Sequence, residues 1–75
     1  MDRIEKLLGF LAHQPTDNFL RHALALEYIK IGKDENAKSL FTEIVTETPS
    51  YVGTYYHLAK LLEKMEQTAE AITWY

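Results

Sequence analysis

Two prolines, Pro15 and Pro49, lie 34 positions apart in a chain of 75 residues. A fixed interval between residues that break helices prompts a search for an internal repeat, because repeat folds reproduce one structural unit along the chain. Shifting the sequence by 34 positions superposes several identical residues, most of them small or apolar. The identical pairs are Leu24 with Leu58, Ala25 with Ala59, Lys30 with Lys64, and Ala37 with Ala71.

The residues within each unit follow an α-helical period. Apolar side chains recur at intervals of three and four, which is the pattern of a helix with one face in a core. Four segments show this pattern, and short connections predict that successive helices pack as antiparallel neighbours. The predicted inward faces are Ile4, Leu7, Leu8 and Leu11, then Leu20, Leu24, Tyr28 and Ile31, then Ala37, Leu40, Phe41, Ile44 and Val45, and finally Tyr55, Leu58, Ala59 and Leu62.

Capping residues mark the predicted helix ends. Asp17 and Asp34 are expected to cap the second and third helices, because a carboxylate can accept hydrogen bonds from the free amides of a first turn. Gly32 is expected to end the second helix in a left-handed conformation that disfavours other residues. Thr68 is expected to cap a fifth helix that runs to Tyr75 without completing its pattern.

Composition limits the fold and the class of partner. Hydrophobic residues make up 47% and charged residues 25%, which is ordinary for one folded domain. Cysteine is absent, which fits a reducing compartment such as the cytoplasm and excludes a disulfide framework. The net charge of −3 argues against nucleic acid or an anionic membrane as a partner. No stretch approaches the roughly 20 apolar residues that a membrane span requires.

The repeat resembles the tetratricopeptide repeat, a unit of 34 residues with the pattern W-x2-L-G-x2-Y, then A-x3-F, then P. Leu24, Tyr28, Ala37, Phe41 and Pro49 occupy their positions in this pattern. The tryptophan position holds Arg21 and the glycine position holds Ala25, which are departures. The second unit gives Tyr55, Leu58, Ala59, Ala71 and Tyr75 in the corresponding positions, with Leu62 in place of the usual tyrosine.

The resemblance implies an all-α solenoid of antiparallel helix-turn-helix repeats with about five helices, the last incomplete. Residues 1–15 would form an N-terminal capping helix, 18–51 a complete repeat and 52–75 a truncated repeat. An unfinished last helix would leave Ile72, Trp74 and Tyr75 as an apolar edge for further repeats or for a second copy of the chain. The alternative function is therefore a structural module that assembles into a homo-oligomer through this edge.

The resemblance also implies a scaffold that binds a peptide or helix of another protein in a concave groove. The first helix of each repeat lines this groove, so its residues outside the repeat pattern are the candidate site. The lysines would receive acidic side chains, and the apolar residues would receive apolar ones. A cover by the leading helix or by another copy explains the apolar residues equally well, and a solvated face explains the lysines. The candidates are Phe19, His22, Leu26, Ile29, Lys30, Tyr56, Lys60 and Lys64.

Catalysis and cofactor binding find no support in the sequence. His13, His22 and His57 have no second ligand at a recognised metal spacing, and no glycine-rich phosphate loop exists. The lysine–asparagine clamp with which some family members hold a terminal carboxylate is also missing, since His22, Leu26 and His57 stand in its positions. The sequence therefore predicts no enzyme activity, no metal and no cofactor.

Overall fold

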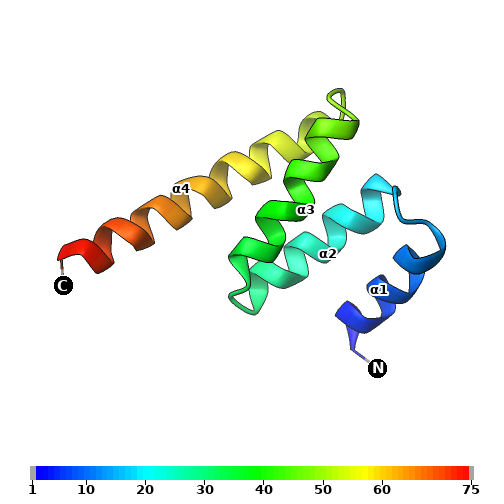
Figure 1. The fold of residues 1–75 in the computed structure, drawn as a ribbon, viewed down its shortest axis with the longest axis horizontal. Coiled ribbons are helices and arrows are strands. Elements are labelled where there is room, and N and C mark those ends of the chain that lie inside the picture. Colours follow the sequence, from blue (N-terminus) through cyan, green and yellow to red (C-terminus); the bar gives the residue numbers. More distant parts are fainter. Residues whose placement is uncertain (1, 75) are drawn as a thin grey trace.

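The computed structural model describes the backbone of residues 2–74 and the side chains of residues 2–66. The described chain forms four helices and no strand: α1 (Arg3–His13), α2 (Asn18–Lys30), α3 (Asp34–Glu47) and α4 (Val52–Trp74) (Figure 1). The all-α repeat architecture is confirmed, and the number of helices is close to the five expected.

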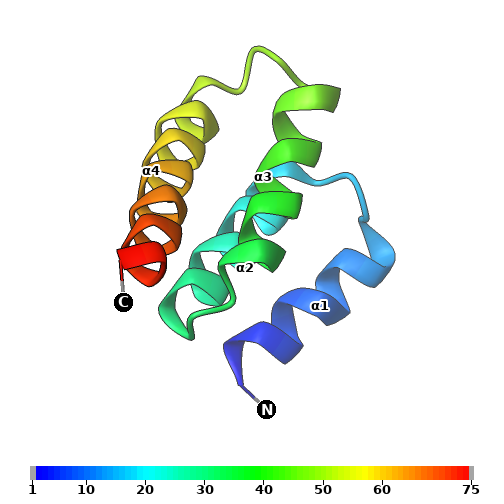
Figure 2. The ribbon, with the colours of Figure 1, turned by 60° about the vertical axis from the view of Figure 1, so that its left-hand side comes forward.

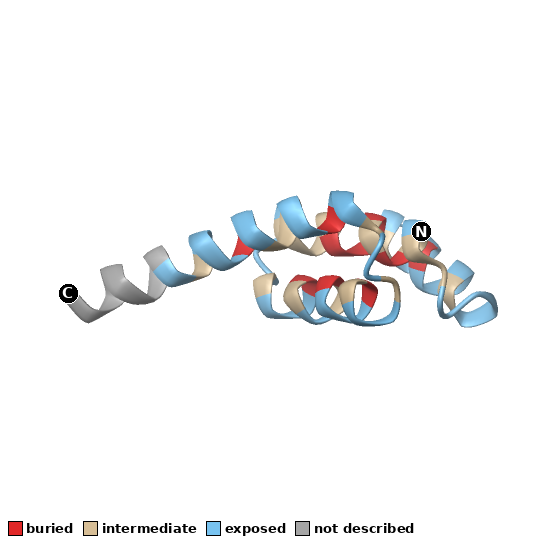
Figure 3. Ribbon diagram, turned by 90° about the horizontal axis from the view of Figure 1, so that it is seen from above, coloured by how far each residue is buried: buried red, intermediate tan, exposed pale blue. Residues whose placement is uncertain are grey.

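The four helices pack as successive neighbours in an elongated, flat molecule of 44 × 32 × 13 Å. The helix α2 packs against both α1 and α3, and α3 packs in turn against α4. Figure 2 shows α2 and α3 as an antiparallel pair with α1 and α4 to either side of it. Seen from above, α3 lies on one side of α2 and α4, and the buried residues lie on the sides that face each other (Figure 3).

The predicted helix ends are confirmed at two positions and wrong at a third. Asp17 Oδ1 accepts a hydrogen bond of 2.9 Å from the amide of Leu20, and Gly32 adopts a φ of 80°. Asp34, however, is the first residue of α3, whose N-cap is Lys33, and no side chain caps that helix. After the left-handed turn at Gly32, α3 begins one residue earlier than expected. The Asp34 carboxylate instead accepts a hydrogen bond from Lys64 Nζ at 3.3 Å.

The main core lies where α2, α3 and α4 meet. Ala25 and Ala37 are fully buried, and their small side chains let α2 and α3 approach closely around Phe41. Ile44 and Leu61 complete this cluster. A second cluster joins α1 to α2 through Leu7, Ala23 and Leu24. In the first unit, the small residues Ala25 and Ala37 and the aromatic residue Phe41 therefore occupy the core, as predicted.

The predicted inward face of α4 is wrong in part. Tyr55 is 43% exposed and Leu62 41% exposed, and Ala59 is also exposed. The buried residues of α4 are instead Thr54 and Leu61. The reason is that Thr54 meets His22 of α2 and Leu61 packs into the core cluster with α3, whereas no described element covers the Tyr55–Leu62 side.

The helix expected to begin after Thr68 is a continuation of α4, which extends to Trp74. Glu66 occupies the repeat position that Gly32 has in the first unit, so no left-handed residue ends the helix there. The predicted assembly edge of Ile72, Trp74 and Tyr75 lies outside the residues whose side chains the structure describes.

Candidate functional site

A cavity of about 330 Å³ lies between α2 and the start of α1. It brings together four residues of the predicted groove, and among them the Phe19 ring is 70% exposed. The helical spacing of three to four residues places these four side chains along one side of α2. The lining residues are Phe19, His22, Ala23, Leu26, Glu27 and Lys30, with Arg3 from α1.

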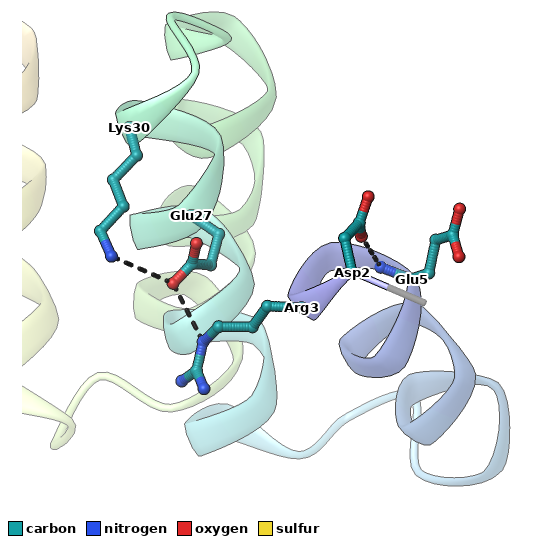
Figure 4. A network of polar contacts seen from close by, with 5 residues as sticks. All are labelled: Asp2, Arg3, Glu5, Glu27 and Lys30. Carbon is teal, nitrogen blue, oxygen red and sulfur yellow. Dashed lines mark hydrogen bonds and ion pairs between the residues drawn. The ribbon is translucent and has the colours of Figure 1, made fainter.

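Glu27 is the acidic residue of this cavity, and it is not among the groove residues predicted from the sequence. Its Oε1 accepts from Arg3 Nε at 2.9 Å and from Lys30 Nζ at 3.4 Å (Figure 4). The glutamate side chain is only 17% exposed, whereas both cations are largely exposed. The positive charge of Lys30 is therefore offset at this end of the groove. The signal in the sequence for this ion pair is the spacing of three residues between Glu27 and Lys30, which places the two side chains next to each other on a helix.

A second cavity, of about 380 Å³, lies where the turn after α3 enters α4. Two histidines line it together with that turn, and His22 belongs to both cavities. His57 stands at a position that the lysine–asparagine clamp uses in some family members, and the sequence does not predict that it meets His22. The lining residues are His22, Ser50, Tyr51, Val52, Gly53 and His57.

His22 contacts all the elements around this second cavity. Its ring lies 5.3 Å from that of Phe41 and 4.9 Å from that of His57, measured between centroids. Its Nδ1 shares a hydrogen bond of 3.0 Å with Oγ1 of Thr54. Burial, and secondarily the charge of His57, hold the pKa of His22 below its usual value of 6.5. A neutral imidazole is thus favoured at the centre of the site.

The groove residues predicted on α4 form a separate cluster. Tyr56 is 61% exposed, and Lys60 Nζ lies 5.4 Å from the centre of its ring, which is a cation–π distance. Lys64 pairs with Asp34 at 3.3 Å. These residues line neither of the two cavities, but Tyr56 contacts His57 edge-on at 5.5 Å. His57 therefore connects this cluster to the second cavity.

Ile29, also predicted in the groove, packs against the main core cluster and is only partly exposed. Leu26 contacts the same cluster while it lines the first cavity. The chain's own core therefore covers at least part of these two apolar side chains.

A third cavity, of about 440 Å³, lies between α1, α2 and α3. Its apolar lining includes Leu8, Leu11 and Tyr28, which the sequence analysis assigned to the core. Leu8 is 46% exposed because α1 covers α2 without closing fully on α3.

The described part of the chain has no group of three or more histidine, cysteine, aspartate or glutamate side chains arranged to hold a metal ion. Among the same residues, no helix combines the length and the apolar character that crossing a membrane requires.

The antiparallel pair of α2 and α3, a core of small and aromatic residues and the 34-residue interval of the sequence are features of a helical repeat protein. A family model for the tetratricopeptide repeat matches residues 20–51 and 52–75, so the chain belongs to the tetratricopeptide repeat family. Repeats of this family are generally protein–protein interaction modules.

The chain is also similar to a human protein, aspartyl/asparaginyl beta-hydroxylase from Homo sapiens. The two are 30% identical over 60 residues, which cover 80% of this chain but only 8% of the relative. The chain thus spans a small part of that protein's length. No solved structure matches the chain.

Proposed function

We propose that this chain is a scaffold that binds a peptide or helix of another protein along α2 and α4. The observation that carries the proposal is the pair of exposed aromatic rings next to the two histidine-lined cavities. Phe19 on α2 lines the first cavity, and Tyr56 on α4 contacts His57 of the second. Exposed aromatic side chains beside a cavity are typical anchors for a partner's apolar groups.

The charges of the groove favour a partner with acidic residues near α4. Lys60 is exposed and forms a cation–π contact but no ion pair within the described residues. Lys30 and Lys64, by contrast, are each paired with a carboxylate. An acidic side chain of the partner would therefore be received at Lys60, and an apolar one in the cavity beside Phe19.

The proposal includes the division of the chain into a capping helix (1–15), a complete repeat (18–51) and a truncated repeat (52–75). The family match to residues 20–51 and 52–75 supports the boundary between the last two. The proposal gives this region a binding role and no catalytic role, whether or not the region forms part of a longer protein.

The test begins with a displayed library of random linear peptides, selected on the wild-type 75-residue chain. The selected peptides should be enriched in aspartate or glutamate next to an apolar residue. Fluorescence anisotropy with one synthetic selected peptide then measures affinity. The double variant Tyr56→Ala/Lys60→Ala should bind roughly tenfold more weakly, because it removes both the ring and the cation.

The chain offers a matched control on α1. Lys6 and Phe10 are also a lysine and an aromatic residue four positions apart, both are exposed, and neither lines a cavity. Lys6→Ala/Phe10→Ala should leave the affinity within about twofold of wild type. Equal losses in the two double variants, or none in the first, would place the binding site elsewhere. Circular dichroism spectra of both variants should show that they remain helical.

A further inference from the structure

Two histidine rings meet edge to face between α2 and α4. The centroids of His22 and His57 lie 4.9 Å apart with an interplanar angle of 78°. We propose that this pair is a proton-sensitive latch: the neutral rings hold the start of α4 against α2, and their protonation releases it. The inference rests on the packing of the helices and does not depend on the proposed groove binding.

The latch includes a hydrogen bond to a fully buried group. Thr54 lies in the first turn of α4 and has no exposed surface, and its Oγ1 pairs with His22 Nδ1 at 3.0 Å. No other hydrogen bond between α2 and α4 is shown by the described side chains. A buried hydroxyl without a partner destabilises the fold, because the group has lost its hydrogen bonds to water without gaining a replacement. Loss of the His22 contact therefore weakens the start of α4.

The side chains in direct contact with the two rings carry no negative charge to compensate protonation, and Glu27, which lines the first cavity with His22, is already paired with Arg3 and Lys30. From α3 the ring of Phe41 faces His22, and from the turn before α4 the ring of Tyr51 faces it at 6.3 Å. From α4 come Thr54 and His57, and beyond His57 lie Tyr56 and the cation of Lys60. None of these side chains is a carboxylate. Two imidazolium groups here would repel each other in a partly desolvated space.

The direction of the pH effect follows from the pKa of His22. Burial and then His57 lower this pKa below 6.5 in the folded state, whereas the unfolded chain has the ordinary value. As pH falls below about 6.5, the unfolded state binds the proton more readily than the folded state. The stabilisation is thus fully present above this pH and is lost as pH falls towards the lowered pKa of His22.

The latch also affects the site, because His22 lines both cavities and His57 lines the second. Release would change the shape of both cavities at once. Mild acidification would therefore alter the surface between α2 and α4.

The first experiment follows each histidine by NMR, through the ring Cε1–Hε1 signals of the 75-residue chain. His22 should titrate below its usual pKa in the wild type. In the His57→Gln variant its titration midpoint should move up towards the usual value. A wild-type midpoint at the usual value, or one that His57→Gln leaves in place, would overturn the proposal.

The second experiment measures Tm by circular dichroism between about pH 7.5 and about pH 5.5, a range that spans the ordinary pKa of a histidine side chain. Wild type should lose Tm towards the acid end. His22→Asn keeps an amide near the Nδ1 position for Thr54 but cannot be protonated, so this loss should fall by roughly half or more. His13→Gln, at an exposed histidine on α1, is the control and should behave as wild type.

If His22→Asn does not fold, the same Tm comparison with His57→Gln decides the question, because His57 is only partly buried. Equal pH dependence in the wild type and in the folded variant would overturn the latch. A failure of peptide binding to Tyr56 and Lys60, by contrast, would leave these Tm results unaffected.

Discussion

The helices α2 and α4 carry equivalent positions of the repeat but differ in what covers them. In α2, Leu24 is 2% exposed and Ala25 is fully buried, because α1 and α3 lie on either side of this helix. In α4, the equivalent of Ala25 is Ala59, which is exposed, and Leu62 is 41% exposed. Within the described part of the chain, α3 packs along α4, and the first turns of α4 also contact α2 through His22.

The contrast is sharpest at the position where the repeat pattern has tryptophan. In α2 this residue is Arg21, a cation that is only 4% exposed, and in α4 it is Tyr55, an aromatic residue that is 43% exposed. Residue type alone would predict the opposite order of burial. Burial in this fold therefore depends on the neighbouring helix more than on the hydrophobicity of the single residue.

The largest expected difference between the helices concerns leucine. Leu24→Ala should destabilise the chain by about 2–5 kcal/mol, because it empties space in a closed cluster. Leu62→Ala should cost less than about 1 kcal/mol, because its side chain is already partly in water. Urea denaturation measures both. Comparable losses would mean that the outer face of α4 is covered in solution.

A smaller contrast is expected for the equivalent alanines. Ala25→Leu should destabilise by about 1–3 kcal/mol, because the added atoms meet the close crossing of α2 and α3. Ala59→Leu should change stability by no more than about 0.5 kcal/mol, because it points away from the core. Thermal denaturation of the two variants tests this pair, and a large loss in Ala59→Leu would contradict the open face.

A smaller effect than for Leu24 or Ala25 is expected when Arg21 is replaced by a residue of similar volume. Arg21 donates to Glu47 Oε2 at 2.9 Å, to Asn18 Oδ1 at 2.8 Å and to the carbonyl of Thr16 at 3.2 Å. Its buried Nε has no partner. Arg21→Met should cost less than about 1 kcal/mol, because Glu47 is 48% exposed and can be hydrated.

Arg21→Ala should cost clearly more, since it leaves a void between α2 and the end of α3. Urea titrations of the two variants separate packing from charge. If Arg21→Met were as damaging as Arg21→Ala, the ion pair rather than the side-chain volume would stabilise this position.

Local chemistry explains which predictions succeeded. Gly32 and Asp17 act through the backbone of their own turn, so their roles follow from neighbouring residues. The burial of Ala37 and Phe41 follows from the repeat pattern, because a small residue and a ring at this spacing suit a helix crossing. Four groove candidates on α2 share a cavity because all four belong to one helix, which fixes their relative positions.

Contacts between helices explain what was missed. His22 and His57 are 35 positions apart, and no local rule brings their rings together. The pairing of Glu27 with Arg3 depends on how α1 crosses α2, which helical period does not reveal. The inward face of α4 was misassigned because several of its faces carry apolar residues, and only the position of α3 selects between them.

The order of the residues was enough to establish a helical repeat of 34 residues, the turn at Gly32 and the small-residue core of the first unit, because these depend on period and on short-range backbone chemistry. The tertiary structure decided which face of α4 is buried, how the charge at Lys30 is balanced and that two histidines meet between α2 and α4. These features depend on distances between helices, which the packing of side chains sets and a one-dimensional pattern does not contain.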